Sequence, residues 1–327
     1  MDRPSIKTLI LPFQRQDRPY PDASKPWAFF NAHPLPDASN WKIGLVCQQS
    51  FRPLYLDLTD TGFVTSPTLE KGGLAGALVL TDRAKAVNER NIAHALLSVS
   101  EGAPILVCGE KNTGIVPLKK WAARLGTVVD TFSKYHAQCF TLIATDMARR
   151  TVSALPVDAN AGLFAKGKID RGSAVLAATF DESLAGDCAD FCAGTGHLAR
   201  ALTEQSKPNS LTLLEAEFHA VEASKAALDD IAIPMSFHWL DLIREAPPAR
   251  YDTIVMNPPF HTARAAEPQL GQALIRAAAK ALRPGGKLRM VANRTLPYEQ
   301  TLQSVFGSFH ELTVEDGFKV LQARANK

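Results

Sequence analysis

Short apolar runs alternate with segments of helical spacing along most of the chain. Apolar runs of this length, bounded by Gly, Pro or Asp, predict buried strands, and the amphipathic segments between them predict helices. Strands that alternate with helices are typical of a mostly parallel α/β sheet. The predicted strands are 54–58, 76–81, 104–109, 138–144, 188–193, 211–215, 236–240, 251–256 and 287–292, and the predicted helices are 88–98, 117–125, 197–203, 220–228 and 268–282.

The pattern changes near residue 150, and the sequence predicts two domains, 1–150 and 151–327. A segment with Gly and Lys, 160–180, runs into an apolar helix, and the α/β rhythm then starts again. Two strands on either side of Gly317 are predicted to form a closing hairpin. The first 40 residues, rich in Pro, Asp and Asn, are predicted to be irregular. The two halves are consistent with a distant duplication of one α/β plan.

Length and composition narrow the class of protein. A chain of 327 residues favours two domains, because a single core stops growing near ~250–300 residues. Hydrophobic residues at 46% and charged residues at 21% exclude a disordered or fibrous chain. No apolar stretch approaches the ~18–20 residues of a membrane span, so we expect a cytoplasmic protein without a membrane partner. The five cysteines have no paired spacing near histidines, so we expect neither a disulfide framework nor a metal.

Charge is distributed unevenly between the two halves. The net charge is +3, with 18 Lys and Arg against 13 Asp and Glu in residues 1–150, and 18 against 20 in the remainder. The basic first half is therefore the favoured docking surface for a polyanion. On charge alone, ordinary solvated surfaces explain the difference equally well.

A turn with small residues follows the predicted strand 188–193. The segment from Asp190 through Cys192, Ala193 and Gly194 to Gly196 leads from that strand into a helix. Small residues at such a turn let the backbone approach a ligand, and the helix N-terminus offers unpaired N–H groups. A glycine turn alone is a weak signal, but its position between a strand and a helix strengthens the prediction.

Two acidic residues end the next two predicted strands. Glu215 lies 19 residues after Gly196, a position from which a carboxylate can accept hydrogen bonds from ribose hydroxyls. Asp241 ends the third strand, where a carboxylate can meet an adenine amine. Either acid alone is explained as a helix cap or a surface residue. Ligands in these folds bind outside the carboxyl ends of the strands, so the turn and both acids together predict one site.

The strongest signal is Asn257-Pro258-Pro259-Phe260, which ends the strand at 251–256. The prolines fix φ and cannot extend a ladder, so the strand stops and the loop is stiff. The side-chain oxygen of Asn257 and the backbone carbonyl of Pro258 are two acceptors for the two protons of an exocyclic amine. Phe260 offers a ring on which a planar base can stack. The alternative is a simple turn before a helix.

In this order the motifs resemble those of class I methyltransferases, which use S-adenosylmethionine. The closer resemblance is to the bacterial rRNA guanine-N2 methyltransferases of the RsmC/RlmG type, and it extends to the segments 272–293, 296–298 and 317–320. The stretch 162–176 is similar to the interdomain loop of that family. The stretch 96–115 is similar to its N-terminal domain, a duplicated methyltransferase fold without cofactor motifs.

The resemblance implies two tandem Rossmann-like class I methyltransferase domains, of which the first is degenerate and positions RNA or supports the second. It implies methyl transfer from S-adenosylmethionine to the N2 amine of a guanine in ribosomal RNA, of the 16S type rather than the 23S type. The internal duplication favours a monomer. The residues assigned to catalysis are Asn257, Pro258 and Phe260, those assigned to the cofactor are Asp190, Cys192, Ala193, Gly194, Gly196, Glu215, Asp241 and Asn257, and those assigned to RNA are Phe260, Lys166, Lys168 and Arg171.

Cys192 departs from the family pattern, which usually has a glycine at this position. Its side chain raises the question of crowding at the methionine end of the cofactor. The three basic residues of the loop are candidates for contacts with phosphates, but solvated loop charges explain them equally well.

Other functions stay open at this point. Protein glutamine N5-methyltransferases have a similar Asn-Pro-Pro motif, usually followed by Tyr rather than Phe, and DNA adenine N6-methyltransferases share the amine chemistry but normally carry a target-recognition insertion. A non-catalytic RNA-binding relic is the third alternative, and Cys192 is the feature that favours it.

Overall fold

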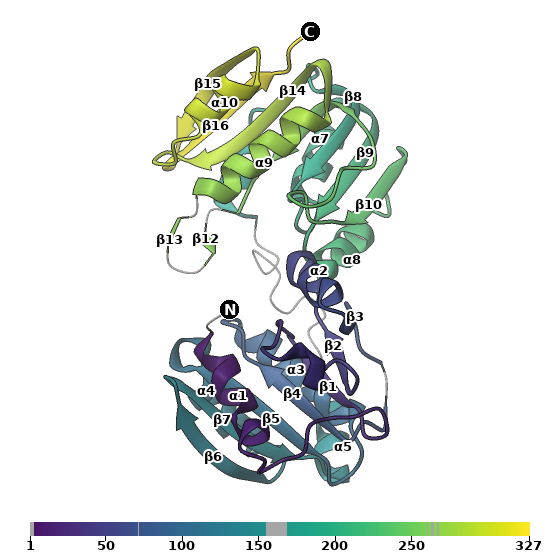
Figure 1. The fold of residues 1–327 in the computed structure, drawn as a ribbon. Helices are drawn as coiled ribbons and strands as arrows, with labels where there is room; N and C mark the ends of the chain where they lie inside the picture. Colours follow the sequence, from purple (N-terminus) through teal and green to yellow (C-terminus); the bar gives the residue numbers. More distant parts are fainter. Residues whose placement is uncertain (1–2, 71, 155–168, 260, 263–264, 267) are drawn as a thin grey trace. The chain divides into compact units, whose positions relative to one another are not determined.

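The computed structural model describes residues 3–70, 72–154, 169–259, 261–262, 265–266 and 268–327. The chain forms two compact units, Met1–Gly162 and Leu163–Lys327, here called unit 1 and unit 2. The division falls after residue 150 because helix α5 (Asp146–Ala154) still packs on helix α3 (Lys85–Ser98) of the first unit. In Figure 1, unit 1 runs from purple to blue-teal and unit 2 from teal to yellow.

Unit 1 is built on a seven-stranded sheet in the order β3-β2-β1-β4-β5-β7-β6. The first five strands of this order are parallel, and β7 pairs antiparallel with both β5 and β6. Its strands are β1 (Trp27–Phe30), β2 (Leu45–Gln48), β3 (Val64–Ser66), β4 (Gly76–Leu80), β5 (Pro104–Glu110), β6 (Val128–Lys134) and β7 (Ala137–Ile143), and its further helices are α1 (Pro4–Gln14), η1 (Ala38–Asn40), α2 (Arg52–Asp60), η2 (Lys111–Thr113) and α4 (Ile115–Ala122).

Unit 2 has a seven-stranded sheet in the order β10-β9-β8-β11-β14-β16-β15, and a separate two-stranded ribbon. Again five strands are parallel, and β16 runs antiparallel between β14 and β15. The strands are β8 (Ala185–Phe191), β9 (Lys207–Glu215), β10 (Met235–Trp239), β11 (Tyr251–Met256), β12 (His261–Thr262), β13 (Ala265–Ala266), β14 (Leu282–Asn293), β15 (Ser308–Glu315) and β16 (Phe318–Arg324), and the helices are α6 (Arg171–Ala177), α7 (His197–Gln205), α8 (Phe218–Ala227), α9 (Pro268–Ala281) and α10 (Glu299–Val305).

The two sheets repeat one topology. Numbered within its own sheet, each has the strand order 3-2-1-4-5-7-6, and only the seventh strand runs antiparallel to its neighbours. The predicted mostly parallel α/β architecture and the predicted terminal hairpin are thus confirmed. The repeat also defines which positions correspond, because β4 in unit 1 takes the place of β11 in unit 2.

Each sheet is covered by helices on both faces (Figure 1). Alternate residues of β4 enter opposite cores: Ala77 and Val79 pack with α3, α4 and α5, whereas Leu78 and Leu80 pack with α1. In unit 2, α9 and α10 cover one face and α6 and α7 the other. Strands buried on both faces read as continuous apolar runs, which is why the sequence located β4, β5, β8 and β11.

Two expectations about the first 60 residues are wrong. The run 54–58 is part of helix α2 rather than a strand, because parallel β2 and β3 must be joined by a crossover. The first 40 residues are not irregular: α1 buries Leu9 and Phe13 in the core, and β1 is a central strand. Pro12 inside α1 and the four-residue length of β1 hid both elements. No helix in the described part of the chain is long and apolar enough to cross a membrane.

Candidate functional site

The residues predicted to bind the cofactor gather at the carboxyl edge of the parallel strands in unit 2. Phe191 of β8 pairs with Met256 of β11 on one side and with Leu214 of β9 on the other. The residues that follow these strands therefore leave the sheet at the same level. This register brings the glycine turn between Glu215 and Asn257, as the sequence predicted for one site.

The glycine turn is fastened to the end of β9. The backbone N–H groups of Cys192 and Ala193 donate to the carbonyl of Leu214, at 2.9 and 3.2 Å. Gly194 and Gly196 both have positive φ, +53° and +85°, a conformation that glycine adopts without strain. A Cβ at Gly194 would meet no atom within 4 Å, so the turn leaves open space where a ligand can approach the backbone.

Cys192 also has a left-handed backbone, with φ +60°. A non-glycine residue in this region is strained by roughly 1–2 kcal/mol. Its side chain packs against the core between the sheet and α9, and burial first, with nearby carboxylates second, raises the pKa of the thiol well above its ordinary value. The thiol is therefore a neutral packing group.

Asp190 lies beneath the turn and is fully buried. Its Oδ2 accepts a hydrogen bond from the backbone N–H of Ala199 in α7, at 3.1 Å, and thereby fixes the start of that helix. No described residue donates to its Oδ1. Burial, with a smaller contribution from the charge of Glu215, raises the pKa of Asp190 well above its ordinary value.

Glu215 connects the turn to the chain that follows β9. Its Oε2 accepts from the backbone N–H of Gly194 at 2.8 Å, and its Oε1 accepts from that of Glu217 at 2.9 Å. Burial raises the pKa of Glu215, while these two hydrogen bonds oppose the shift. Each oxygen keeps a second lone pair, so the carboxylate can still accept two hydrogen bonds from vicinal hydroxyls.

Asp241 follows β10 and is 5% exposed. Its Oδ1 accepts from the backbone N–H of Ile243 at 2.9 Å, and its own N–H donates to the Glu245 carboxylate at the same distance. Next to it, the Trp239 indole donates to the carbonyl of Ala216 at 2.9 Å. The end of β10 is thereby joined to the residue after Glu215.

Asn257 has the most constrained side chain of the site. Its Nδ2 donates to Asp170 Oδ2 at 2.8 Å and to Ser173 Oγ at 2.7 Å, which uses both amide hydrogens. A carboxylate oxygen accepts hydrogen bonds, so the contact with Asp170 settles which end of the amide is nitrogen. The Oδ1 atom is buried, and no described residue donates to it.

Asp170 and Ser173 were not predicted from the sequence. Asp170 caps helix α6 by accepting from the backbone N–H of Ser173 at 3.0 Å, so one carboxylate starts the helix and holds Asn257. An Asp three residues before a Ser at the start of an apolar segment is a helix-start signal. It indicates the cap but not the contact with a residue 87 positions away.

The predicted RNA-binding residues are only partly described. Lys166, Lys168 and Phe260 lie outside the described residues. Arg171, at the first position of α6, forms an ion pair with Asp316 at 2.6 Å and is 68% exposed. A phosphate at Arg171 would compete with this partner.

Unit 1 has lost the ligand groups at the corresponding edge. Asn31 repeats the left-handed backbone of Cys192, with φ +51°. Gln49 takes the place of Glu215 and also accepts from the N–H two residues later, but its amide donates to the carbonyl of Ala32 at 2.7 Å. Leu80, which matches Asn257 in the register of the strands, is a fully buried apolar residue, so unit 1 has no amide at this position. At the positions that correspond to the ligand groups of unit 2, the side chains of unit 1 bond or pack within the unit.

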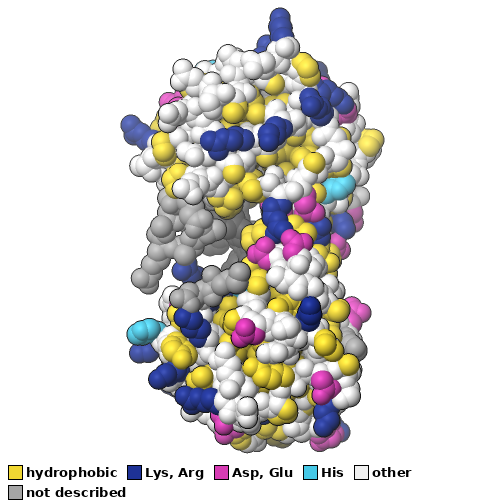
Figure 2. Space-filling view, viewed as in Figure 1, with side chains coloured by type: hydrophobic (Ala, Val, Ile, Leu, Met, Phe, Trp, Pro, Cys, Tyr) yellow, Lys and Arg dark blue, Asp and Glu magenta, His cyan; other side chains and the backbone are white. Residues whose placement is uncertain are grey.

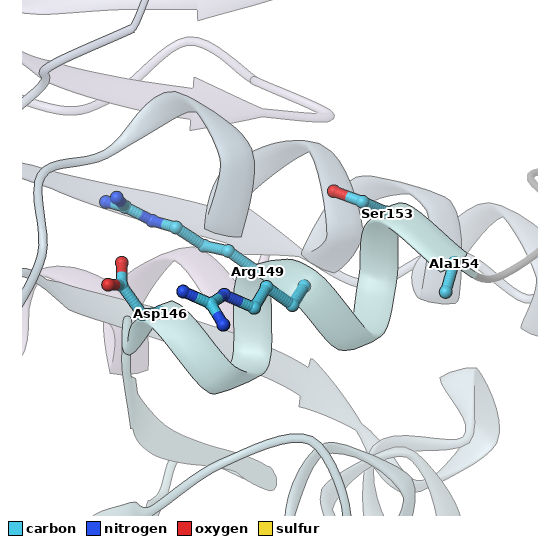
Figure 3. A pocket seen from close by; sticks show the side chains of 5 residues that line it. Asp146, Arg149, Ser153 and Ala154 are labelled. Carbon is cyan, nitrogen blue, oxygen red and sulfur yellow. The ribbon is translucent and has the colours of Figure 1, made fainter.

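Two hollows lie on unit 1. One follows α5 between Asp146, Arg149 and Ser153 (Figure 3), where Arg149 donates to the carbonyls of Leu96 and Val99 and so serves the fold. The other, of about 520 Å³, lies between the end of β5 and the β6–β7 turn. Among the described residues, no cluster of His, Cys, Asp and Glu could hold a metal ion.

Comparison with known proteins places the chain in a family. The family model described as methyltransferase small domain matches residues 154–322. Proteins named ribosomal RNA small subunit methyltransferase C are similar to the chain: that of Klebsiella pneumoniae is 34% identical over 67% of this chain and 66% of its own length, and that of Serratia proteamaculans is 33% identical over 70% and 68%. The protein of Proteus mirabilis is 38% identical over 53% of this chain and 50% of its own length. The matched part of the chain thus spans about half to two thirds of the length of these relatives.

One solved structure matches both units. It is described as a T. thermophilus 16S rRNA N2 G1207 methyltransferase (RsmC) in complex with AdoMet and guanosine, and it superposes with a TM-score of 0.80 over 98% of this chain and 92% of its own. At 22% identity this match shows the fold alone, and it confirms the predicted tandem arrangement of two Rossmann-like α/β domains.

Proposed function

We propose that this chain, which belongs to the methyltransferase small domain family, transfers a methyl group from S-adenosylmethionine to the exocyclic N2 amine of a guanine in small-subunit ribosomal RNA. The relatives named ribosomal RNA small subunit methyltransferase C support this choice of RNA. The similar structure that is described with AdoMet and guanosine supports the choice of cofactor and base.

The proposal depends chiefly on the side-chain oxygen of Asn257, a buried acceptor to which no described residue donates. An unsatisfied buried acceptor costs about 1–3 kcal/mol, so its presence at the end of β11 calls for a donor from outside the described residues. The exocyclic amine of guanine is such a donor. Pro258 and Pro259 stiffen the following loop, so this acceptor meets its ligand in a fixed place.

The residues of the edge fit S-adenosylmethionine. The turn at Gly194 has room for a ligand against the backbone, and Glu215 has lone pairs left for two ribose hydroxyls. Asp241, at the end of the neighbouring strand β10, is the candidate partner of the adenine amine. When bound there, the cofactor supplies an electrophilic methyl group, so the protein contributes mainly orientation.

The chain's own residues act on the nucleophile. The lone pair of the guanine amine is delocalised into the ring, which makes the amine a poor nucleophile. Hydrogen bonds from its two protons to Asn257 Oδ1 and to the carbonyl of Pro258 favour a pyramidal nitrogen and direct its lone pair. Methylation makes the amine acidic, and the proton then leaves to water. No general base is required.

The substrate base must be accessible for this chemistry. A guanine in a helix has to leave the stack, or the RNA segment has to be open already. Unit 1 lacks the ligand groups of unit 2, so we assign it to positioning the RNA or supporting unit 2. We expect the chain to act as a monomer, which sedimentation of the purified protein tests. We expect it to act in the cytoplasm, which cell fractionation tests.

The test is methyl transfer in vitro to small ribosomal subunits and to naked small-subunit rRNA, both from cells that lack the gene. Nucleoside analysis should find N2-methylguanosine, and large-subunit rRNA serves as the control. Methylation of adenine or of protein glutamine instead would overturn the assignment. Cofactor binding without transfer to any of these would favour the non-catalytic alternative.

A further inference from the structure

We propose that the β6–β7 turn of unit 1 is a contact surface for an unpaired RNA segment, with Tyr135 stacking on a base and Lys111 and Lys134 contacting phosphates. The inference deepens the proposed function, on which it rests for an RNA substrate. We call the exposed residues Lys111, Lys134, Tyr135 and His136 the turn surface.

The turn surface lies at the carboxyl edge of the parallel strands of unit 1. Glu110 at the end of β5 pairs with Ala137 at the start of β7, so the two-residue turn before Ala137 stands beside the end of β5. Between them lies the groove of about 520 Å³, within the usual size of ligand pockets. In the other unit of the same chain, this edge of the sheet carries the proposed ligand groups.

The residues of the turn are conformationally costly. Tyr135 and His136 both have positive φ, +48° and +61°. Two-residue hairpin turns of this kind strongly favour Asn-Gly or Asp-Gly. The corresponding β15–β16 turn of unit 2 has Asp316 and Gly317 with the same signs of φ, +54° and +82°. The same turn in one chain is thus built once from suitable residues and once from unsuitable ones.

Strain of this kind persists where the side chains have a task. The Tyr135 ring is 45% exposed, and Lys111, Lys134 and His136 are exposed. The task is therefore not burial in a core. The turn is held in place from below, because the Thr8 hydroxyl of α1 donates to the carbonyl of Lys134 at 2.7 Å.

The chemistry of the turn surface favours RNA. An exposed aromatic ring beside cations is the arrangement by which proteins hold unpaired nucleotides without strict sequence preference. The Lys134 ammonium lies 5.8 Å from the centroid of the Tyr135 ring, so a base that stacks on the ring stands next to this cation. Neither Lys111 nor Lys134 forms an ion pair with a described residue, and Glu110 is the one carboxylate that lines the groove. On the flank of unit 1 that carries α4 and β6, Lys and Arg side chains gather with a His (Figure 2).

The first test replaces the turn by the residues that its geometry prefers, in the full-length protein. The double variant Tyr135→Asn with His136→Gly should keep or raise the unfolding temperature, because strain is relieved, and leave the affinity for S-adenosylmethionine unchanged. Its affinity for a small-subunit rRNA transcript should fall about tenfold in a filter-binding assay. Tyr135→Phe, which keeps the ring, should bind like the wild type. A double variant that gains stability and binds RNA within twofold of the wild type would overturn the inference.

The second test concerns the lysines. Lys111→Gln with Lys134→Gln should reduce the slope of log affinity against log salt by about 1.4, since each phosphate contact to a single strand contributes about 0.7. Lys42→Gln, which removes an exposed charge before β2 at the opposite edge of the same sheet, is the matched control and should leave the slope unchanged. Equal slopes for the lysine pair and the control would remove the phosphate contacts.

Two outcomes separate this inference from the proposed function. If the wild type does not methylate rRNA, the proposed function fails, whatever the turn variants do. If it does, and the turn variants lose affinity only for assembled subunits and not for naked RNA, the turn contacts a ribosomal protein and the RNA inference is wrong.

Discussion

Asn257 uses both amide hydrogens in hydrogen bonds within unit 2, so only its side-chain oxygen is left for a ligand. The sequence predicted Asn257 because a polar residue directly after a buried strand, followed by two prolines, has few structural uses. It could not predict that Asp170 and Ser173 set the direction of the amide. Their contact depends on the path of the chain before α6, which local pattern does not encode.

The orientation of this amide is therefore open to a test. Asp170→Ala removes one anchor, and we expect kcat to fall about ten- to a hundredfold with little change in cofactor affinity, because the acceptor loses its position. Asp170→Asn keeps an acceptor oxygen and the helix cap, and should recover most of the activity. Steady-state kinetics with calorimetric cofactor binding provide the measurement. Equal stability loss in both variants with unchanged kcat would make Asp170 a helix cap only.

Asp190 gives a prediction about pH. Burial raises its pKa in the folded chain, so the folded state holds the proton more tightly than the unfolded state and stability falls as pH rises towards the raised pKa. Asp190→Asn cannot ionise, so in cofactor-free protein it should be more stable than the wild type at pH 7 by about 1–3 kcal/mol. The difference should shrink as the pH is lowered through the raised pKa towards 4. Urea unfolding over this range is the measurement, and a difference that grows in acid would contradict the burial argument.

Among the elements, the packing of α7 against α8 explains one of the two glycines of the turn. A Cβ at Gly196 would lie 2.8 Å from Leu228 Cδ1, whereas at Gly194 it would meet nothing within 4 Å. Gly196 is thus needed for close packing as well as for its backbone, and Gly194 for its backbone and for open space. The sequence motif alone does not distinguish these reasons.

A matched pair of variants separates them. Gly194→Ala should cost about 1–2 kcal/mol of unfolding free energy from the left-handed backbone. Gly196→Ala adds an overpacking cost, for a total of about 2–5 kcal/mol. The extra cost should be smaller in a Leu228→Ala background, where the clashing side chain is gone. The measurement is denaturant unfolding of the wild type, the two glycine variants, Leu228→Ala, and Gly196→Ala combined with Leu228→Ala. Identical costs at both glycines would contradict the packing argument.

The whole molecule contains two copies of one topology, and only the copy in unit 2 keeps the proposed ligand groups. The strands Gly76–Leu80 and Tyr251–Met256 could be predicted because they are buried on both faces and read as apolar runs, whereas the central strand Trp27–Phe30 was too short to be recognised. Helix α2 could not, because Leu54, Leu56 and Leu58 alternate with other residues like a half-buried strand, and the need for a crossover is a property of the topology. The missing motifs predicted that unit 1 lacks a ligand site. In the structure, Gln49 at the position of Glu215 donates to Ala32, and the apolar Leu80 is buried at the position of Asn257.

The division of labour between the units predicts the behaviour of a fragment. Residues 163–327 should fold and bind S-adenosylmethionine, because unit 2 contains its own sheet, cores and glycine turn. The fragment should bind rRNA more weakly than the full chain and with a shallower salt dependence, because fewer phosphates are neutralised. Filter binding over a salt series measures both quantities. Equal affinity and slope would mean that unit 1 is a structural partner only.

In the proposed function, Asn257 directs methylation of a guanine N2 amine in small-subunit rRNA. The most direct test is nucleoside mapping of this rRNA from cells that lack the gene and carry either the wild type or Asn257→Ala. We expect one N2-methylguanosine to be absent without the gene, restored by the wild type and not restored by the variant, although the purified variant still binds S-adenosylmethionine. Restoration by Asn257→Ala, or an unchanged set of N2-methylguanosines in the deletion strain, would contradict the account.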